Sequence, residues 1–185
     1  MRFCPTELAG VIIVEPDVHR DARGFFLETY HAEQYRTAGI TGTFVQENHS
    51  LSGGKTIRGL HAQVQHPQGK LIRVIEGEIF DVAVDIRRGS PTYMRWVSVI
   101  LSAANFRQLY IPPGFAHGFA VTTTRAQVVY KCTEFYDPTD EISLAWNDSA
   151  IGVEWPFRNP VLSERDRLAP SLNAVEKSLP VHESQ

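Results

Sequence analysis

Short runs of β-branched and aromatic residues, separated by turn residues, fill most of the chain. Such runs, bounded by turn signals such as Gly77 and Pro112–Gly114, are typical of β-strands. The pattern predicts strands at Gly24–Tyr30, Thr43–Ser50, Thr56–Gln63, Lys70–Glu76, Glu78–Ile86, Arg95–Leu101, Gln108–Pro112, His117–Val121 and Ala126–Phe135. Helix is scarce, with one short candidate at His31–Ala38 and another after Pro160.

The strand predicted over Glu78–Ile86 shows the clearest alternation of apolar and other residues. Its apolar series is Phe80, Val82, Val84 and Ile86, and the residues between them are Asp81, Ala83 and Asp85. Alternation with a period of two is typical of a strand that has one face in the core and one in water. The sequence therefore predicts a half-buried strand here.

Many short strands joined by tight turns indicate a mainly β protein of the sandwich, jelly-roll or barrel type. No linker and no internal repeat divides the chain. We therefore expect a single domain over residues 1–185, with an N-terminal arm at about residues 1–40 and a C-terminal extension at about residues 150–185.

Composition and charge exclude several classes of protein. Of the 185 residues, 43% are hydrophobic, which is enough for a sizeable core and excludes disorder as the main state. Eighteen basic and 21 acidic residues give a net charge of −3, which argues against nucleic-acid binding. The apolar stretch Leu8–Val14 is too short for a signal peptide or a membrane span. Because Cys4 and Cys132 make no disulfide framework, we predict a cytoplasmic protein with no membrane contact.

Five of the predicted strands carry polar side chains that are unusual on a solvated face. These side chains are Gln46, Asn48, His49, Arg58, His61, Gln63, Lys70, Arg73, His117 and Tyr130. In a barrel closed around a cavity, they would line a polar pocket for an anionic, hydroxyl-rich ligand. For any one of them alone, a wet outer face or a hydrogen-bonded core position is the alternative.

The segment Pro112–Phe119 contains the pattern P-x-G-x-x-H, which resembles the second motif of the cupin superfamily. In metal-binding cupins this histidine, here His117, joins a His-x-His pair and an acidic residue around a divalent ion. The matching pair would begin at His61, but its second position is Gln63, a poor ligand for such metals. We therefore predict no metal site. A metal-dependent cupin oxygenase that uses His61 and His117 is the alternative from a different class.

Seven segments, in order along the chain, carry a more specific likeness. They are Asp21–Phe26, Arg58–His61, Gln68–Lys70, Phe80–Thr92, Pro113–Phe119, Tyr130–Thr133 and Leu162–Asp166. Together they resemble the dTDP-4-dehydrorhamnose 3,5-epimerase family, from about Gly10 to Pro170. The resemblance implies a cupin-like jelly roll that works as a homodimer without a metal or cofactor. It also implies that the N-terminal arm is exchanged between the subunits.

The implied reaction converts dTDP-4-dehydro-6-deoxy-D-glucose into dTDP-4-dehydro-L-rhamnose, in dTDP-L-rhamnose biosynthesis, by inverting C3 and C5. Both carbons lie next to the C4 ketone, so loss of either proton gives an enolate. Inversion needs one group to remove a proton and another to return a proton to the opposite face. A fixed cation near O4 would stabilise the enolate oxyanion. Epimerases that invert only C3 or only C5, and a noncatalytic sugar-nucleotide-binding module, are alternatives.

Four residues are the catalytic candidates that the resemblance implies. His61 resembles the base, Asp166 the carboxylate that orients it, Lys70 the lysine that stabilises the oxyanion, and Tyr130 the acid on the opposite face. The segment Ser163–Asp166 also fits a helix capping box, in which Asp166 would only hold the start of a helix.

The remaining candidates bind substrate by the same resemblance. Guanidinium groups suit a diphosphate, and the candidates are Arg23, Arg58 and Arg167. Polar contacts to the nucleotide and sugar are implied for Glu28, Gln46 and Asn48. Stacking on the thymine ring is implied for Phe26 and Tyr136, and His117 is a pocket residue near the sugar without an assigned role.

Arg58 and His61 have opposite parity on one predicted strand, so a regular strand could not aim both side chains into one cavity. Gly59 lies between them and could form a bulge that corrects the parity. Without a bulge, either Arg58 is not a direct ligand or it reaches the partner subunit's site.

Overall fold

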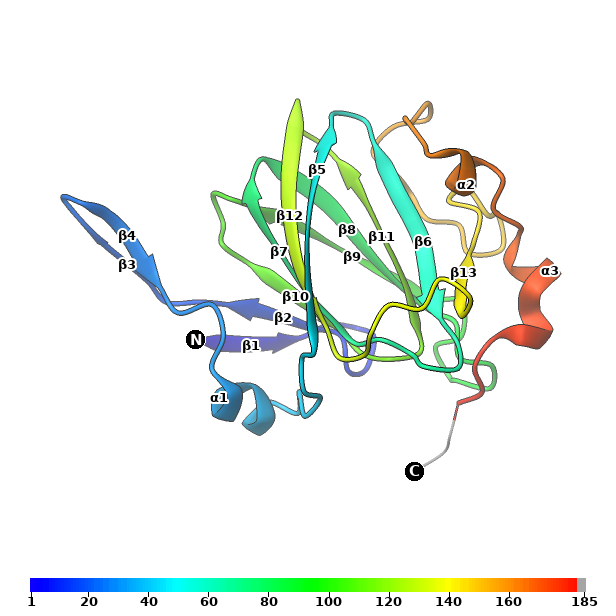
Figure 1. Ribbon diagram of the computed structural model, residues 1–185, viewed down its shortest axis with the longest axis horizontal. Coiled ribbons are helices and arrows are strands. Elements are labelled where there is room, and N and C mark those ends of the chain that lie inside the picture. The colour runs from blue at the N-terminus through cyan, green and yellow to red at the C-terminus, as the bar shows by residue number, and fades with distance from the viewer. Residues whose placement is uncertain (183–185) are drawn as a thin grey trace.

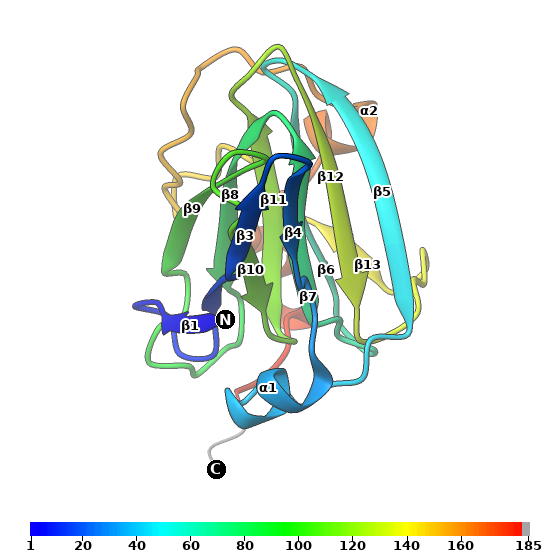
Figure 2. The same cartoon turned by 90° about the vertical axis from the view of Figure 1, so that its left-hand side faces the viewer.

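Two antiparallel sheets pack face to face and form the body of the protein (Figure 1, Figure 2). The computed structural model describes residues 1–182. The six-stranded sheet has the order β1 (Arg2–Pro5), β2 (Ile12–Glu15), β10 (Gln108–Ile111), β7 (Lys70–Glu76), β12 (Arg125–Cys132) and β5 (Gln46–Gly53). The five-stranded sheet has the order β13 (Glu141–Ser143), β6 (Ile57–Gln63), β11 (Phe115–Val121), β8 (Glu78–Asp85) and β9 (Trp96–Ser102). This two-layer arrangement confirms the predicted mainly β jelly-roll class.

The helices of the described residues are short. They are α1 (Ala32–Thr37), α2 (Glu164–Arg167), α3 (Leu172–Val175) and a 3₁₀ turn at Glu176–Ser178. Both predicted helical regions are thus confirmed. Within residues 1–182, no helix has the length and apolar character needed to cross a membrane.

All nine predicted strands are present, with ends that differ from the prediction by a few residues. The sequence did not predict four others, namely β1, β2, β13 and β3 (Val18–Asp21), each only three or four residues long. Segments this short show no clear period. They become strands because a neighbour pairs with them, as β10 pairs with β2 and β6 pairs with β13.

The prediction that β8 is half-buried is wrong, although its alternation is correct. Val82 and Val84 of the apolar series are buried as predicted, but they pack beneath the C-terminal segment, with residues such as Leu172. On the opposite face, Ala83 belongs to the core between the sheets, and Asp81 is completely buried. Both faces are covered because the chain returns over the outside of the five-stranded sheet, a long-range contact that alternation cannot reveal.

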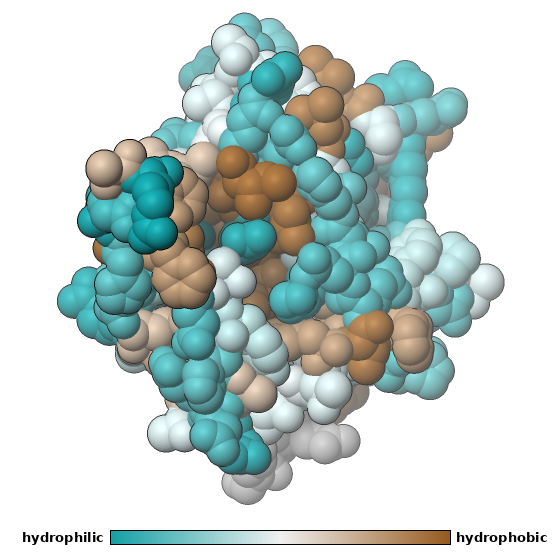
Figure 3. Space-filling model, turned by 60° about the vertical axis from the view of Figure 1, so that its left-hand side comes forward, coloured by the Kyte–Doolittle hydropathy of each residue, from teal (hydrophilic) through white to brown (hydrophobic). Residues whose placement is uncertain are grey.

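The N-terminal segment divides into two parts. β1 and β2 extend the six-stranded sheet beyond β10, and Tyr35 of α1 is buried in a cluster beside them. The hairpin of β3 and β4 (Gly24–Leu27) instead projects away from the sandwich (Figure 1). Its Phe25 and Phe26 are largely exposed. Figure 3 shows apolar side chains in a hollow beside this hairpin, where a groove is lined by residues that include Phe25, Leu27, Ile75 and Phe106.

Candidate active site

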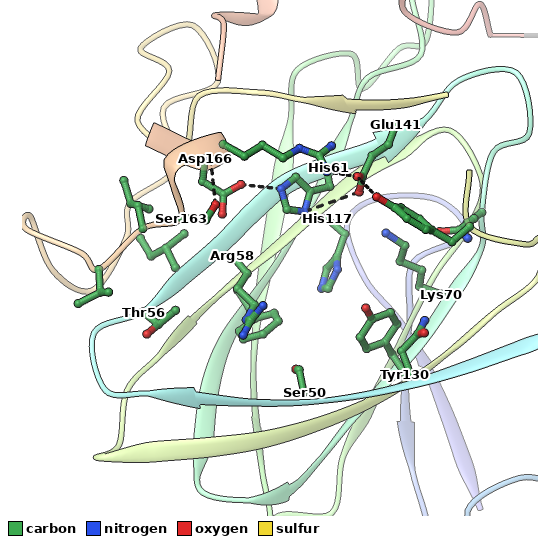
Figure 4. A pocket seen from close by; sticks show the side chains of 18 of the residues that line it. Ser50, Thr56, Arg58, His61, Lys70, His117, Tyr130, Glu141, Ser163 and Asp166 are labelled. Carbon is green, nitrogen blue, oxygen red and sulfur yellow. Dashed lines mark hydrogen bonds and ion pairs between the residues drawn. The ribbon is translucent and has the colours of Figure 1, made fainter. Parts of the chain in front are cut away.

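A pocket of about 600 Å³ lies between the two sheets, near the edges formed by β5 and by β6 and β13 (Figure 4). Nine of the predicted site residues line it: Gln46, Asn48, Arg58, His61, Lys70, His117, Tyr130, Tyr136 and Asp166. Residues from both sheets and from α2 therefore meet at one place. The predicted polar pocket is confirmed for seven of them, because Tyr136 and Asp166 were suggested by the family resemblance and not by the strand pattern. His49, Gln63 and Arg73 do not line it.

His61 and Asp166, which are 105 positions apart in the sequence, form a short hydrogen bond. His61 Nε2 lies 2.6 Å from Asp166 Oδ1, with the two side chains 24% and 4% exposed. Burial alone would raise the pKa of Asp166, but the hydrogen bond and charge of His61, together with the hydrogen bonds of Ser163 and the Gly59 backbone, outweigh it and hold that pKa below its ordinary value. The ionised carboxylate of Asp166 accepts a hydrogen bond from the Nε2–H group of His61. The other ring nitrogen, Nδ1, is then free to act as the basic nitrogen.

The local structure of α2 explains why Asp166 can reach His61. Ser163 caps this helix, because its Oγ accepts a hydrogen bond from the backbone N–H of Asp166 at 3.1 Å. The capping pattern seen in the sequence is thus correct for Ser163. The Asp166 carboxylate turns toward His61, so the short helix presents the carboxylate to the pocket.

A β-bulge at Gly59 brings Arg58 and His61 into the same pocket. Opposite β11, His61 pairs with His117 and Arg58 pairs with Phe119, so β6 contains one extra residue between the two pairs. Gly59 has a φ of +106°, which favours glycine. The predicted bulge is confirmed, and both side chains line the pocket.

Lys70 and Tyr130 line the pocket from the six-stranded sheet, opposite His61. Burial lowers the pKa of Lys70, while the acidic groups of Cys132, Glu141 and Asp81 act in the other direction. Burial raises the pKa of Tyr130 and keeps its phenol protonated. The pocket therefore holds the half-buried amine of Lys70 and the half-buried, protonated phenol of Tyr130, both facing the histidine.

His117 forms a second histidine–carboxylate pair deeper in the pocket wall. Its Nε2 lies 3.0 and 2.9 Å from the two carboxylate oxygens of Asp81. Burial raises the pKa of Asp81, and the charge and hydrogen bond of His117 oppose that shift. In His61 as in His117, a carboxylate engages Nε2. Among residues 1–182, no three His, Cys, Asp or Glu side chains are grouped to hold a metal ion.

Two charged pocket residues escaped the sequence prediction, Glu141 and Arg165. Glu141 Oε2 accepts a hydrogen bond from Tyr136 Oη at 3.0 Å and pairs with Arg165, while Oε1 lies 4.0 Å from His61 Nδ1. Arg165 could have been found, since it precedes Asp166 in one of the seven segments. Glu141 had no such signal, because it lies on the unpredicted strand β13.

Comparison with known proteins agrees with this site. A family model described as dTDP-4-dehydrorhamnose 3,5-epimerase matches residues 5–174. The chain belongs to the dTDP-4-dehydrorhamnose 3,5-epimerase family. It is thus an epimerase of that family, as the seven segments predicted.

Individual relatives are similar over most of this chain. A dTDP-4-dehydrorhamnose 3,5-epimerase from Salmonella typhimurium is 52% identical over 171 residues, which cover 91% of this chain and 93% of that protein. One from Neisseria gonorrhoeae is 49% identical over 96% of this chain, which spans 55% of that longer protein. The crystal structure of dTDP-6-deoxy-D-glucose-3,5-epimerase from Legionella pneumophila, in complex with dTDP-4-keto-L-rhamnose, has a TM-score of 0.95 and 46% identity and covers 99% of both chains.

Four residues that the epimerase resemblance suggested do not line this pocket: Arg23, Phe26, Glu28 and Arg167. Arg23 lies in the turn of the projecting hairpin, Phe26 lies on β4 and Glu28 comes directly after it; the Arg23 side chain is 91% exposed and pairs with Asp21. Arg167 is also exposed and lies 3.9 Å from Glu164. Of the three cationic residues that the resemblance assigns to the substrate, Arg58 and Lys70 therefore line the pocket and Arg23 does not.

Proposed function

We propose that this epimerase inverts C3 and C5 of dTDP-4-dehydro-6-deoxy-D-glucose and releases dTDP-4-dehydro-L-rhamnose for dTDP-L-rhamnose biosynthesis. One observation carries the proposal. A histidine oriented by a carboxylate and the half-buried phenol of Tyr130 face each other from opposite sheets across one pocket, and the amine of Lys70 lines the pocket beside the phenol. These are the three groups that enolate formation and opposite-face reprotonation require.

His61 acts as the base in this proposal. Asp166 holds the Nε2 proton and stabilises the imidazolium that forms when Nδ1 takes a proton from C3 or C5. Each C–H is acidified by the adjacent C4 ketone, so its electron pair moves into the enolate and places negative charge on O4. The ammonium of Lys70 stabilises that oxygen, and the step needs no cofactor.

Tyr130 acts as the acid. It stands on β12, and His61 stands on β6 of the facing sheet, so a sugar ring held between them is open to each group from a different side. Its raised pKa keeps the phenol protonated at neutral pH and available to the carbanion carbon. Protonation by Tyr130 on the face opposite His61 gives inversion.

The rest of the pocket suits the nucleotide diphosphate. Arg58 of β6 places a guanidinium group in the pocket, and its Nε donates a hydrogen bond to Ser52 Oγ at 2.8 Å. We assign this guanidinium to the diphosphate. Gln46 and Asn48 lie on the same face of β5. Tyr136 lies beside them, because its backbone N–H donates a hydrogen bond to Gln46 Oε1 at 2.9 Å. We assign these three to the nucleotide and sugar.

The projecting hairpin supports a homodimer in which each arm serves the partner's pocket. Phe26 is 71% exposed on the hairpin, beside an apolar groove that a second copy would cover. In such a dimer Arg23, Phe26 and Glu28 complete the pocket of the partner subunit. Cys4 and Cys132 are both free thiols, which fits the cytoplasmic location that we also propose.

Incubation with dTDP-4-dehydro-6-deoxyglucose in heavy water tests the reaction. We expect deuterium at both C3 and C5, together with the L-configured product. Deuterium at one carbon only would indicate a single-site epimerase, and none at either carbon would exclude epimerisation of this sugar. His61→Ala protein is the matched control.

Mixing two inactive variants tests the exchanged arm. Arg23→Ala protein keeps an intact pocket but lacks the arm's guanidinium, and His61→Ala protein keeps the arm but lacks the base. Mixed dimers would contain one complete site, so we expect activity to return on mixing. Activity that stays at the level of the separate variants would contradict an exchanged arm.

A further inference from the structure

Asp81 is a buried acidic group that the mechanism above does not use. It stands in the middle of β8, its side chain is 0% exposed, and both carboxylate oxygens lie within 3.0 Å of His117 Nε2. Within the described part of the chain, His117 is its only hydrogen-bonding side chain. Burying a carboxylate is unfavourable unless it is well paired, so this position calls for a reason beyond stability.

A second aspartate on the same strand shows what a structural carboxylate looks like here. Asp85 lies on the same face of β8 and is equally buried. It accepts hydrogen bonds from Arg87, Ser90 and Thr92 and holds the turn that follows the strand. Asp81 has no such set of local donors, and its single partner is a residue that lines the active-site pocket.

The pair of Asp81 and His117 faces the groups that handle the enolate. His117 lies directly opposite His61 across β11 and β6, and Lys70 lines the same pocket from the other sheet. Three acidic groups act on Lys70 from the strands around it: Cys132 on β12, Glu141 on β13 and Asp81 on β8. Burial lowers the pKa of Lys70, and the negative charge of Asp81 opposes that shift.

We propose that Asp81 is a positioning residue of the epimerase: its buried carboxylate holds His117 through Nε2 and is the counter-charge that keeps the Lys70 ammonium protonated beside the developing enolate. The inference rests on the proposed function, in which Lys70 stabilises O4. Asp81 itself does not touch the substrate. It acts through His117 and Lys70, which do line the pocket.

The test compares Asp81→Asn with Asp85→Asn. In Asp81→Asn, Lys70 loses a counter-charge and becomes neutral at lower pH, so the alkaline limb of the deuterium-exchange rate moves to lower pH. At neutral pH we expect exchange and kcat to fall about tenfold to hundredfold with KM nearly unchanged, less than the loss of a direct oxyanion donor. Tyr130 does not explain such a shift, because Asp81 is not among the charges that act on its pKa.

Asp85→Asn removes an equally buried carboxylate from the same face of the strand. The alkaline limb of its exchange-rate profile against pH should stay at the wild-type pH. An unchanged limb in folded Asp81→Asn protein would overturn the proposal, as would an equal shift in Asp85→Asn. A double-mutant cycle with Lys70→Gln adds a second check, because Asp81→Asn should have little further effect on exchange once Lys70 is gone. Additive losses would contradict action through Lys70.

A measurement on the wild-type protein covers the case in which Asp81→Asn does not fold. Nitrogen NMR of the histidine rings should show His117 carrying a proton on Nε2 throughout the active pH range. A neutral ring protonated on Nδ1 instead would overturn the proposal. If the wild-type protein exchanges no deuterium at all, the proposed function fails, whereas the histidine spectrum still reports on Asp81 and His117.

Discussion

The pocket contains two histidine–carboxylate pairs built from the same residue types but placed differently. His61 and Asp166 are 24% and 4% exposed, and the carboxylate comes from a short helix near the end of the chain. His117 and Asp81 are 9% and 0% exposed, and the carboxylate comes from the centre of a strand. The pKa of Asp166 is lowered and that of Asp81 is raised.

The surroundings of the two carboxylates explain the opposite shifts. Asp166 is stabilised as an anion by His61, by Ser163 and by the backbone N–H of Gly59, and these interactions outweigh its burial. For Asp81, burial outweighs the contributions of His117 and Lys70. In the proposed mechanism, the base is the histidine that has an exposed edge and a well-stabilised carboxylate. The enclosed pair instead sets charge in the pocket wall.

Replacing each of the two histidines in turn should show the largest difference between the two pairs. His61→Ala removes the base, and we expect exchange at both C3 and C5 to fall about 10⁴-fold, the upper range for a general base. His117→Ala should slow exchange about tenfold to hundredfold without abolishing it, because the base remains. Proton NMR of the substrate in heavy water measures both rates. A larger loss of exchange in His117→Ala than in His61→Ala would contradict the assignment of His61 as the base.

Tyr130→Phe separates proton removal from proton return. The variant keeps His61 and Lys70, so deuterium should still enter the substrate at a measurable fraction of the wild-type rate. Inversion should fall by about 10²-fold, since the phenol that protonates the opposite face is missing. Comparison of deuterium content with product configuration checks this. Equal losses of exchange and product would count against Tyr130 as the opposite-face acid.

Asp166→Asn should weaken the base and also change the pH dependence of stability. Activity should fall about tenfold to hundredfold, because the amide cannot stabilise the imidazolium. A carboxylate whose pKa is lowered by folding stabilises the protein above its unfolded pKa of about 3.9 and loses that contribution as pH falls through the folded value. The stability difference between wild type and Asp166→Asn should therefore be steady down to about pH 4 and shrink below it. Denaturant unfolding at several pH values measures it.

The sequence predicted the pair of His61 and Asp166 only through the likeness of seven segments to a family. Local pattern alone favoured a helix cap for Asp166, and the structure shows Ser163 making that cap. The contact with His61 spans 105 positions, so no local signal could reveal it. Local and long-range roles of one segment can both be real.

The second pair was hidden for a different reason. The alternation along β8 correctly put Asp81 on the face opposite Val82, but alternation does not say which face is inside. The usual inference places the aspartates in water. Here the C-terminal segment covers the apolar face, so the face with Asp81 turns toward the pocket. Glu141 was hidden because β13 has only three residues and is ordered by pairing with β6.

Gly59→Ala should have the smallest effect on catalysis among these variants. It tests the bulge that brings Arg58 and His61 together. A Cβ at this position would lie 2.6 Å from the backbone oxygen of His117, and the φ of +106° is strained for alanine. We expect a loss of about 2–4 kcal/mol in unfolding free energy and a higher KM as Arg58 moves. Gly39→Ala is the matched control. It has a φ of +89° with nothing within 4 Å, so strain alone should cost about 1 kcal/mol. If both variants lose the same stability, the close approach of β11 to Gly59 does not constrain β6. The presence of the Arg58 and His61 side chains in one pocket would then need another explanation.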